Sequence, residues 1–433
     1  MTLVLADIGE LLTMAGPKPG LGTRTEQIKN AEVALGRIEN AVVVIVDETI
    51  YFAGPASLAP PAHLLPQPVT VKTARGRLVT PGLCDPHTHL LWAGDRCAEF
   101  EKRGLGATYQ EIAAQGGGIL QTVRQTNAQT DDALRQLLRA RLFTMLSMGT
   151  TMCEVKNGYG RTPQAELRLL RLITEVARQH PCGVSPTFLC HVPEESANPS
   201  ERAHAVDELG QALSTARQQG AFALDVYCDE GAFTLKETEF LLRTGKQLGL
   251  ALRCHAEQFT YTGAAQLAAS LSALSVEHLE QIDEGGRLAL SRVGNGPTTV
   301  ANLLPGAALQ LRLPWPDASA LVAAGATVAL GTDCNPGSSL CFSQPLMMSL
   351  ACTYMGLSCA EAWLGATVHA ALAIGQPQKG RLTRGSRADL VMWDADHYRQ
   401  VCQQIGGNLA RSVWVGGQAL FADGRFVAED EAP

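Results

Sequence analysis

The sequence has few charged residues and no long apolar run, and each shortage excludes a class of protein. Charged residues make up 18% of the 433 positions, and the net charge of −7 comes from scattered acidic side chains. Nucleic-acid binding needs a concentrated basic surface, so we expect no nucleic-acid partner. The longest β-branched run, residues 42–46, is far too short to cross a bilayer, and we expect no membrane association.

The sequence also lacks the signs of secretion. Residues 1–14 include Asp7 and Glu10 and have no basic start, unlike a secretory signal. The 12 cysteines are dispersed and contain no Cys-x-x-Cys pair. In a reducing compartment such cysteines act as small buried hydrophobes. We therefore expect a soluble cytoplasmic protein with structural thiols and no disulfide framework.

The apolar content predicts a compact body with more than one domain. Hydrophobic residues make up 46% of the chain, which is typical of a folded protein. A single core stops growing at roughly 250–300 residues, so a chain of 433 residues is expected to divide. One large domain with a smaller one is the simplest division.

Short β-branched segments near both ends predict the smaller domain. Residues 41–47 and 69–73 are separated by a Pro-rich stretch, and residues 388–393 and 412–415 are followed by turns at Gly416-Gly417 and Asp423-Gly424. We predict a small β-sandwich domain built from residues 1–75 and 376–433.

Between these segments, apolar strand-like runs alternate with stretches of helical period. This alternation is typical of parallel βα units. It predicts a (β/α)₈ barrel over residues 76–375, of the α/β class. The expected strands are residues 83–91, 150–156, 184–191, 223–228, 251–255, 275–278, 298–303 and 327–333.

The first chemical feature is the pair His87 and His89, near the end of an expected strand. Residues two apart on a strand point to the same face, so both imidazoles can bind one ion. Taken alone, the pair could equally be two core or surface histidines. Its context favours a site, because His191, His255 and His278 each fall near the end of another expected strand, as does Asp333. In a barrel these strand ends meet on the face that carries the active site.

Imidazole and carboxylate ligands suit Zn²⁺ or a similar divalent ion, which can lower the pKa of a bound water to about 7. Hydrolysis is the reaction class that this chemistry favours. Asp333 could bind the ion through one oxygen and accept the proton of the water through the other. His278, if it is not a ligand, could polarise the carbonyl group of the substrate.

Four motifs carry a resemblance to a known family. They read Pro-Gly-Leu-Cys-Asp-Pro-His-Thr-His from Pro81, Ala-Gly-Asp-Arg from Ala93, Glu-Val-Lys-Asn-Gly-Tyr-Gly from Glu154 and Gly-Thr-Asp-Cys-Asn-Pro-Gly-Ser from Gly331. On these motifs the chain resembles the amidohydrolase superfamily and, within it, the imidazolonepropionase family of histidine degradation. The resemblance spans nearly the whole chain. It implies a hydrolase of cyclic amides that converts 4-imidazolone-5-propanoate to N-formimidoyl-L-glutamate, with a homodimer as the assembly.

The resemblance also implies a set of site residues. His87, His89, His255 and Asp333 would bind one zinc or iron ion. The implied contacts with the small-molecule substrate or product are Arg96, Tyr109, Tyr159, His191, Asn335, Gly337 and Ser338. Arg96 suits this role chemically, because a guanidinium can hold a carboxylate such as the propanoate through two charge-assisted hydrogen bonds.

One position departs from the pattern of some family members. Gln258 stands three residues beyond His255, where a Glu can occur, and it follows Glu257. An amide cannot shuttle a proton, but it can hydrogen-bond an imidazolone ring. We therefore assign Gln258 to substrate binding at the catalytic centre and leave the general base with Asp333. Glu257 would point elsewhere if the segment stays extended.

Three alternatives stay open from the sequence. The first is a deaminase or another cyclic amidase of the same superfamily. The second is a two-metal site bridged by a carboxylated lysine, for which Lys156 is the one lysine in a strand-end motif. The third is a barrel that binds a metal or ligand without catalysis, since a fold alone does not establish activity.

Overall fold

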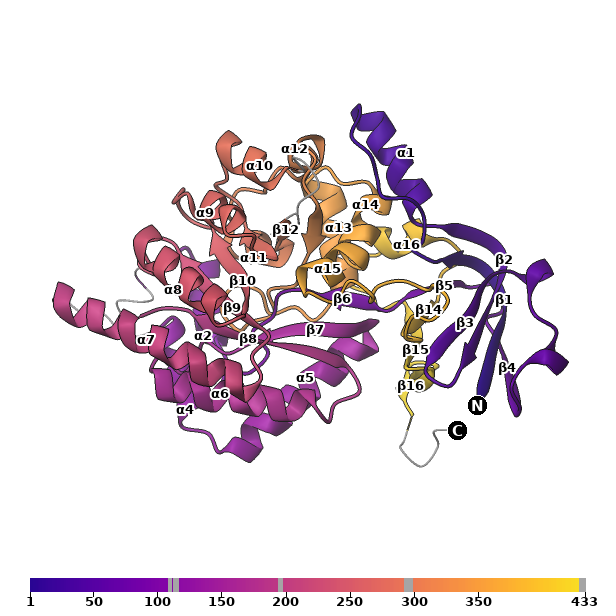
Figure 1. Ribbon diagram of the computed structural model, residues 1–433, viewed down its shortest axis with the longest axis horizontal. Coiled ribbons are helices and arrows are strands. Elements are labelled where there is room, and N and C mark those ends of the chain that lie inside the picture. Colours follow the sequence, from indigo (N-terminus) through magenta and orange to yellow (C-terminus); the bar gives the residue numbers. More distant parts are fainter. Residues whose placement is uncertain (108–110, 112–116, 194–197, 292–298, 428–433) are drawn as a thin grey trace.

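The computed structural model describes residues 1–107, 111, 117–193, 198–291 and 299–427. Figure 1 shows a barrel of strands and helices beside a smaller β domain, with both chain termini in the smaller part. This arrangement agrees with the fold class predicted from the sequence.

The barrel wall is an eight-stranded, parallel sheet in which each strand pairs with its neighbours in chain order. The strands are β6 (Leu83–Asp85), β7 (Thr150–Lys156), β8 (Gly183–Cys190), β9 (Ala223–Cys228), β10 (Ala251–Ala256), β11 (Ser275–His278), β12 (Val300–Leu303) and β13 (Val328–Leu330). Strands such as β7 and β9 are buried along nearly their whole length, as expected where helices cover a parallel sheet.

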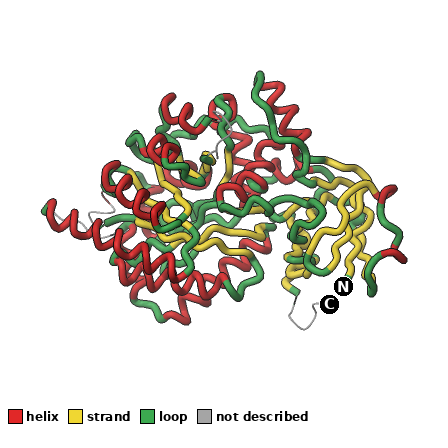
Figure 2. The backbone as a smooth tube through the Cα atoms, in the orientation of Figure 1, coloured by secondary structure: helices red, strands yellow, loops and turns green. Residues whose placement is uncertain are grey.

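Helices surround the wall (Figure 2). They are α2 (Cys97–Gly104), α4 (Ile119–Asn127), α5 (Asp131–Ser147), α6 (Pro163–Ala177), α7 (Pro199–Gln219), α8 (Leu235–Gln247), α9 (Ala264–Ser270), α10 (Glu284–Leu290), α11 (Pro305–Leu311), α12 (Ala318–Ala323), α13 (Gln344–Tyr354), α14 (Cys359–Gly365) and α15 (Val368–Ala373). Thr130, Thr162 and Thr234 begin α5, α6 and α8, and each side chain accepts a hydrogen bond from the first turn.

The barrel closes beyond the ends of its first and last strands. Thr88 and Cys334 form a parallel bridge, and the Asp333 amide donates to the His87 carbonyl over 3.0 Å. The strands themselves are shorter than predicted, since β6 ends at Asp85 rather than at residue 91 and β13 ends at Leu330 rather than at 333. Pro86 has no amide hydrogen to continue the first ladder. The segments beyond these ends carry the chemical side chains instead.

The smaller domain is one mixed sheet of nine strands drawn from both ends of the chain. Its strands are β1 (Thr2–Leu12), β2 (Arg37–Val46), β3 (Thr49–Pro55), β4 (Val69–Thr73), β5 (Leu78–Pro81), β14 (Leu390–Trp393), β15 (Ala410–Val415), β16 (Gln418–Ala422) and β17 (Arg425–Phe426). β5 pairs with β1 and with β14, which joins the two ends. Alternate residues of β1 pack into two apolar clusters, one on each face. The domain bounds at residues 75 and 376 stay a prediction.

Helices inserted in the smaller domain pack against the barrel. α1 (Arg24–Ala34) contacts α14, and Arg24 forms an ion pair with Glu361. α16 (Tyr398–Gln403) contacts α13 and α14. Among the described residues, no helix is long and apolar enough to cross a membrane.

Candidate metal centre and active site

Four histidines and one aspartate converge at the carboxyl ends of the barrel strands. His87 and His89 follow β6, His255 lies in β10, His278 ends β11 and Asp333 follows β13. Asp333 Oδ1 lies 3.6 Å from His87 Nε2 and 3.4 Å from His89 Nε2. The His87 and His255 ring centroids are 4.5 Å apart. The structure therefore brings together the four ligands predicted from the sequence, with His278 beside them.

The chemistry of this donor set fits a divalent ion. His87 is fully buried and its Nε2 makes no hydrogen bond. Burial and the neighbouring cationic groups, Lys156 first among them, hold the pKa of His87 well below its usual value, so the ring is neutral. Burial opposes ionisation of Asp333, but the hydrogen bond from His89 and the nearby histidines lower its pKa overall. Neutral imidazole and ionised carboxylate are the forms that bind Zn²⁺ or Fe²⁺.

Two buried carboxylates orient the imidazoles from behind. His255 Nδ1 lies 3.0 Å from Asp225 Oδ1, and His87 Nδ1 lies 3.2 Å from Glu277 Oε2. A carboxylate at one ring nitrogen fixes the rotation of the ring and raises the basicity of the other nitrogen. Asp225 therefore turns His255 Nε2 toward the site, while His87 Nδ1 faces Glu277 without forming a hydrogen bond.

A buried lysine balances these carboxylates. Lys156 Nζ lies 2.8 Å from Glu154 Oε2 and 3.3 Å from Asp225 Oδ2, and all three side chains are fully buried. Burial works against the charge, but Glu154 and Asp225 raise the pKa of Lys156 overall, so it is an ammonium ion. A bridging carbamate needs a neutral amine and would place another negative charge beside two carboxylates. This environment disfavours the carboxylated lysine of a two-metal site.

Several residues at the mouth hold backbone conformations that L-residues rarely adopt. Positive φ angles occur at Glu257 (53°), His278 (76°), Leu279 (73°) and Asp333 (51°). Such strain costs of order 1–3 kcal/mol for each residue and concentrates at functional sites. The strained turns direct His278 and Asp333 into the space between the strand ends.

His278 is also paired with a buried carboxylate, that of Glu280. Its Nδ1 lies 3.5 Å from Glu280 Oε1, and neither Glu280 oxygen makes a hydrogen bond. Burial opposes the charge on His278, but Glu280 raises its pKa above the usual value. The imidazolium form can donate a hydrogen bond to a substrate oxygen.

The loop after β7 presents Tyr159 and supports His191. The Glu166 carboxylate accepts four hydrogen bonds of 2.6–2.8 Å, one from the Asn157 side chain and the others from the amides of Gly158, Gly160 and Arg161. His191 Nδ1 lies 3.0 Å from the Gly158 carbonyl, which can only accept, so the proton is on Nδ1. Its Nε2 is therefore free to accept, and its ring stacks on His89 with centroids 5.5 Å apart.

The loop after β13 positions Asp333. Ser338 Oγ donates to Asp333 Oδ2 over 3.0 Å, and Asn335 Nδ2 donates to the Asp333 carbonyl over 2.7 Å. Asn335 Oδ1 accepts from the amides of Gly337 and Ser338. The side chain of Asn335 is thus engaged within the loop. Its predicted contact with substrate, like that of Ser338, stays a prediction.

Arg96 lies beside this loop, which joins two of the sequence motifs in space. A Cβ at Gly337 would lie 3.0 Å from Arg96 Nη1, so a larger residue there would require the guanidinium to shift by a few tenths of an ångström. Glu99 pairs with Arg96 Nε and Nη2. The Nη1 side of the guanidinium faces the loop.

The other predicted residues are placed less directly. Tyr109 lies outside the described residues. Gln258 is buried two residues after β10. Glu257 turns away because its Oε1 accepts from Thr262 Oγ1 and the Ala265 amide, both over 3.4 Å, although the segment does not stay extended: β10 ends at Ala256 and Glu257 has a φ of 53°.

Asp225, Glu277 and Glu166 were not predicted from the sequence. Asp225 and Glu277 lie within short strands whose residues are almost all buried. A charged side chain inside such a strand is costly to bury without a partner, and this was the available signal. Glu166 lies in the first turn of α6, where an acidic residue is ordinary, so no signal distinguished it.

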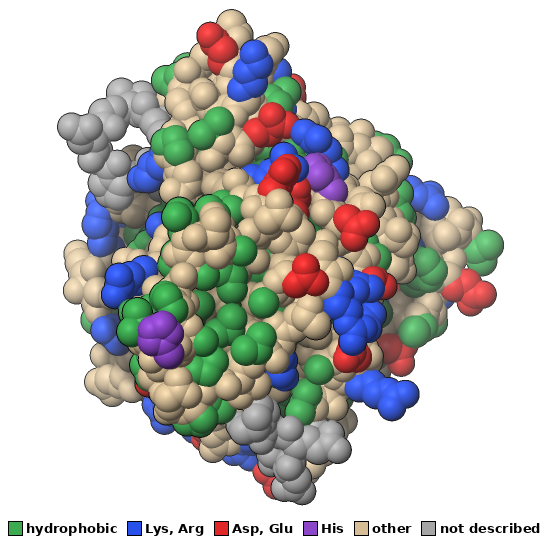
Figure 3. All heavy atoms as spheres, turned by 90° about the vertical axis from the view of Figure 1, so that its right-hand side faces the viewer, with side chains coloured by type: hydrophobic (Ala, Val, Ile, Leu, Met, Phe, Trp, Pro, Cys, Tyr) green, Lys and Arg blue, Asp and Glu red, His purple; other side chains and the backbone are tan. Residues whose placement is uncertain are grey.

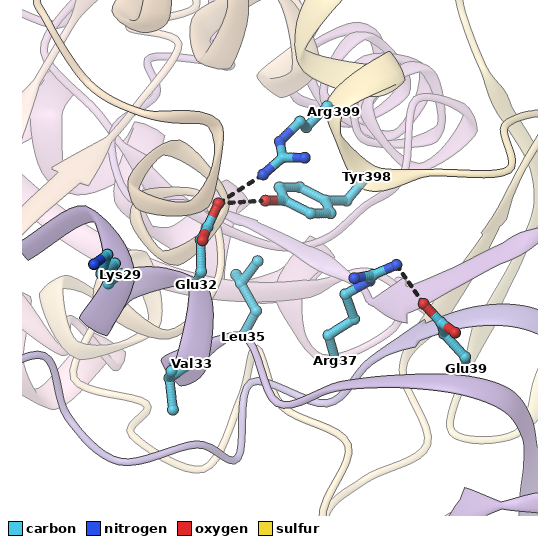
Figure 4. Close-up of a pocket in the computed structure, with 8 residues that line it drawn as sticks. All are labelled: Lys29, Glu32, Val33, Leu35, Arg37, Glu39, Tyr398 and Arg399. Carbon is cyan, nitrogen blue, oxygen red and sulfur yellow. Dashed lines mark hydrogen bonds and ion pairs between the residues drawn. The ribbon is translucent and has the colours of Figure 1, made fainter. Parts of the chain in front are cut away.

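A hollow of about 700 Å³ lies away from these residues, between α1, β2 and α16 (Figure 4). Four of its charged side chains form ion pairs, since Arg399 pairs with Glu32 over 2.6 Å and Arg37 pairs with Glu39 over 2.7 Å. It contains no group poised for catalysis, and the barrel mouth is the better candidate site.

Comparisons with known proteins agree with this site. Residues 78–420 match the amidohydrolase family. The chain is 39% identical to an imidazolonepropionase from Deinococcus radiodurans, covering 94% of this chain and 97% of that protein. It is 45% identical to an imidazolonepropionase from Rubrobacter xylanophilus, covering 84% and 88%.

Solved structures share the fold at low sequence identity. A triazine hydrolase variant is 17% identical, with a TM-score of 0.70 and coverage of 99% of this chain and 96% of that chain. An adenosine deaminase from Xanthomonas campestris with bound zinc is also 17% identical, with a TM-score of 0.69 and coverage of 99% and 94%. At this identity the likeness concerns the fold alone.

Proposed function

This chain belongs to the amidohydrolase family and, within it, to the imidazolonepropionases, and on that basis we propose that it hydrolyses 4-imidazolone-5-propanoate to N-formimidoyl-L-glutamate. The observation that carries the proposal is the convergence of His87, His89, His255 and Asp333 at one barrel mouth, with Arg96 beside the same loop as Asp333.

We propose one divalent ion per chain, held by His87, His89, His255 and Asp333. The ion would act as a Lewis acid and lower the pKa of a water molecule to about 7. The donor set accepts zinc or iron. The ammonium of Lys156 between two carboxylates supports a single ion. Metal analysis of the purified protein tests this, and two tightly bound ions per chain would contradict it.

Each protein group has a defined task in the proposed reaction. Asp333 accepts a proton from the attacking water, whose oxygen bonds to the ring carbonyl carbon while the ring C–N bond breaks and the nitrogen gains a proton. The charged His278 donates a hydrogen bond to the carbonyl oxygen as negative charge develops there. Arg96 binds the propanoate, and Tyr159, His191 and Gln258 line the ring.

Turnover tests the proposal directly. The metal-loaded protein is incubated with freshly prepared 4-imidazolone-5-propanoate, and the loss of ring absorbance is followed. We expect Asp333→Asn to abolish turnover and lower the metal content, while the exposed control Asp207→Asn behaves as the unchanged protein. Absence of turnover by the metal-loaded protein would contradict the assigned substrate.

We also propose a cytoplasmic homodimer. All 12 cysteines are free, as expected in a reducing compartment. Hydrophobic side chains gather on the face of the smaller domain shown in Figure 3, and Leu58, Leu64 and Val71 are each more than 60% exposed. Such a patch is typical of a surface that another protein covers. Light scattering in solution tests the assembly, and a mass of 46.1 kDa, that of one chain, would contradict it.

A further inference from the structure

A second group of metal-binding side chains lies outside the proposed active site. Cys352 lies in α13, Cys359 begins α14 and Cys402 lies in α16. Their sulfur atoms all lie within 4.8 Å of one another. The three helices pack against each other, and none of them carries a residue of the proposed reaction. We call these three residues the thiol triad.

The thiol triad differs from the other close cysteines in its access to solvent. Cys352 and Cys359 are partly exposed, while Cys402 is buried. By contrast, Cys153 and Cys182 are fully buried, with their sulfur atoms 4.0 Å apart. Two residues of the thiol triad therefore border solvent, whereas the Cys153 and Cys182 pair is enclosed.

The triad has weak bonds to the rest of the protein. Cys402 Sγ lies 3.9 Å from the Cys359 carbonyl, which is a long contact even for sulfur. Hydrogen bonds from Cys352 and Cys402 lower the pKa of Cys359, and hydrogen bonds with Cys352 and Cys359, together with burial, raise the pKa of Cys402. The three sulfurs therefore interact mainly with one another, in a cluster compact enough to surround one cation.

We propose that Cys352, Cys359 and Cys402 bind one thiophilic cation, for which Cu(I) is the best match. Three thiolates without imidazole or carboxylate form a soft ligand set, which favours Cu(I). Structural zinc almost always takes four ligands, and the carboxylate of the neighbouring Glu361 is already engaged by Arg24 and Ser358. Binding releases thiol protons and transfers no electrons.

The geometry needs little adjustment. A metal–sulfur distance of about 2.3 Å places three sulfurs of a trigonal site about 4 Å apart. The observed upper limit is 4.8 Å, so movements of less than about 1 Å by side chains on three packed helices close the site. Cys352 and Cys359 are partly exposed, so they are less tightly enclosed than Cys402.

Copper competition tests the proposal. The full-length, zinc-loaded protein is titrated anaerobically, with ascorbate, against the coloured Cu(I) complex of bicinchoninate. We expect the unchanged protein to remove one equivalent of Cu(I) and to keep its zinc. Cys359→Ser and Cys402→Ser should lose that equivalent. Cys97→Ser, which removes an exposed thiol elsewhere, is the matched control and should retain it.

The ligands and the fold are checked separately. X-ray absorption at the copper edge should show a shell of sulfur alone, and a nitrogen shell would place the ion on histidines and overturn the proposal. Equal uptake by the unchanged protein and Cys359→Ser would also overturn it, as would no uptake at all. Circular dichroism and hydrolytic activity confirm folding of each variant. Cys359→Ser alone suffices if the buried Cys402→Ser variant does not fold.

Discussion

Two histidines at the barrel mouth have pKa values that their surroundings shift in opposite directions. Burial and the neighbouring His89 and His255 lower the pKa of His191 to about 3, so its ring is neutral and can accept a hydrogen bond. Burial works in the same direction at His278, but there Glu280 outweighs it and raises the pKa. One residue type thus supplies an acceptor and a donor within one site, which separates the two roles that binding an imidazolone ring requires.

Arg96→Lys tests the proposed carboxylate contact. Lysine keeps the charge but lacks the planar fork that pairs with Glu99 while also facing the loop at Gly337. We expect KM for the propanoate substrate to rise by roughly tenfold or more, with a much smaller fall in kcat, because the contact is remote from the reacting bond. Steady-state kinetics measures both. The exposed Arg384→Lys is the control, and an unchanged KM for Arg96→Lys would contradict the contact.

His180 predicts a specific pH dependence of stability. Burial lowers its pKa to about 4, while the unfolded chain binds the proton near pH 6.5. The unfolded state therefore binds more protons between these values, and this contribution to stability is lost as the pH falls from about 6.5 to about 4. Asn at this position could still accept the Cys182 amide hydrogen bond that Nδ1 accepts now.

We expect His180→Asn to lose less stability than the unchanged protein between about pH 7 and about pH 5. Urea midpoints at both values measure the difference. Loss of metal at acid pH affects both proteins, so the comparison isolates His180. Parallel curves for the two proteins would show that His180 does not contribute.

At the scale of elements, the active site depends on loops that buried carboxylates hold in place. The Glu166 carboxylate accepts hydrogen bonds from amides of the loop after β7, which has no helix or sheet partner for them. Asp85 plays the same part where the barrel closes. Asp85 accepts from Thr332 Oγ1 over 2.6 Å and from the Thr332 amide over 3.1 Å. Loops that carry functional residues are therefore fixed to the rigid barrel rather than left free.

Glu166→Gln tests this support. In glutamine, an NH₂ group stands in place of one carboxylate oxygen, which accepts hydrogen bonds from backbone or side-chain N–H groups. Two of those donors therefore lose their acceptor. Because each unsatisfied buried donor costs about 1–3 kcal/mol, we expect a loss of about 2–5 kcal/mol in the free energy of unfolding. We also expect lower kcat/KM, since the Gly158 carbonyl holds His191 and the same loop carries Tyr159.

The control is Glu237→Gln, which removes a similar carboxylate at the start of α8. Glu237 accepts from the Thr234 amide and pairs with Arg202, but it belongs to no proposed site. We expect it to lose stability and keep its activity. Urea denaturation and steady-state kinetics compare the two variants, and full activity in Glu166→Gln would contradict the role of the loop.

The sequence predicted elements whose pattern is local and missed interactions between distant segments. The strand β9 was found at its observed bounds because an apolar run between turns is visible in one window. The segment after Asp85 was predicted as a continued strand, because its apolar residues 90–93 are buried without being paired in the sheet. Asp225 could not be assigned to His255, since only the parallel pairing of β9 and β10 makes them neighbours.

At the scale of the whole molecule, the barrel interior contains buried charged side chains, whereas the interior of most domains is mainly apolar. Arg253 donates to the Pro86 carbonyl over 2.9 Å and to the Ala373 carbonyl over 2.6 Å, and it is fully buried. It connects the middle of the wall to the first strand and to the last barrel helix. These two hydrogen bonds tie the segment that leads to His87 and the last barrel helix to the wall, which links the site to the rest of the barrel.

Metal removal is therefore expected to weaken the whole domain. Without an ion, the buried His87, His89, His255 and Asp333 lose the ligand that pairs their donor atoms. A ligand at about 1,000 times its Kd stabilises the folded state by about 4 kcal/mol, so chelation should lower the melting temperature by roughly 5 °C.

Differential scanning calorimetry measures the shift, and zinc or iron added back separately shows which ion restores it. Before chelation, His255→Asn should already melt at the lower temperature, and the chelator should change that temperature little. Metal analysis shows when the ion has been removed from the unchanged protein. If the melting temperature has not fallen at that point, the result would contradict the link between the site and the fold.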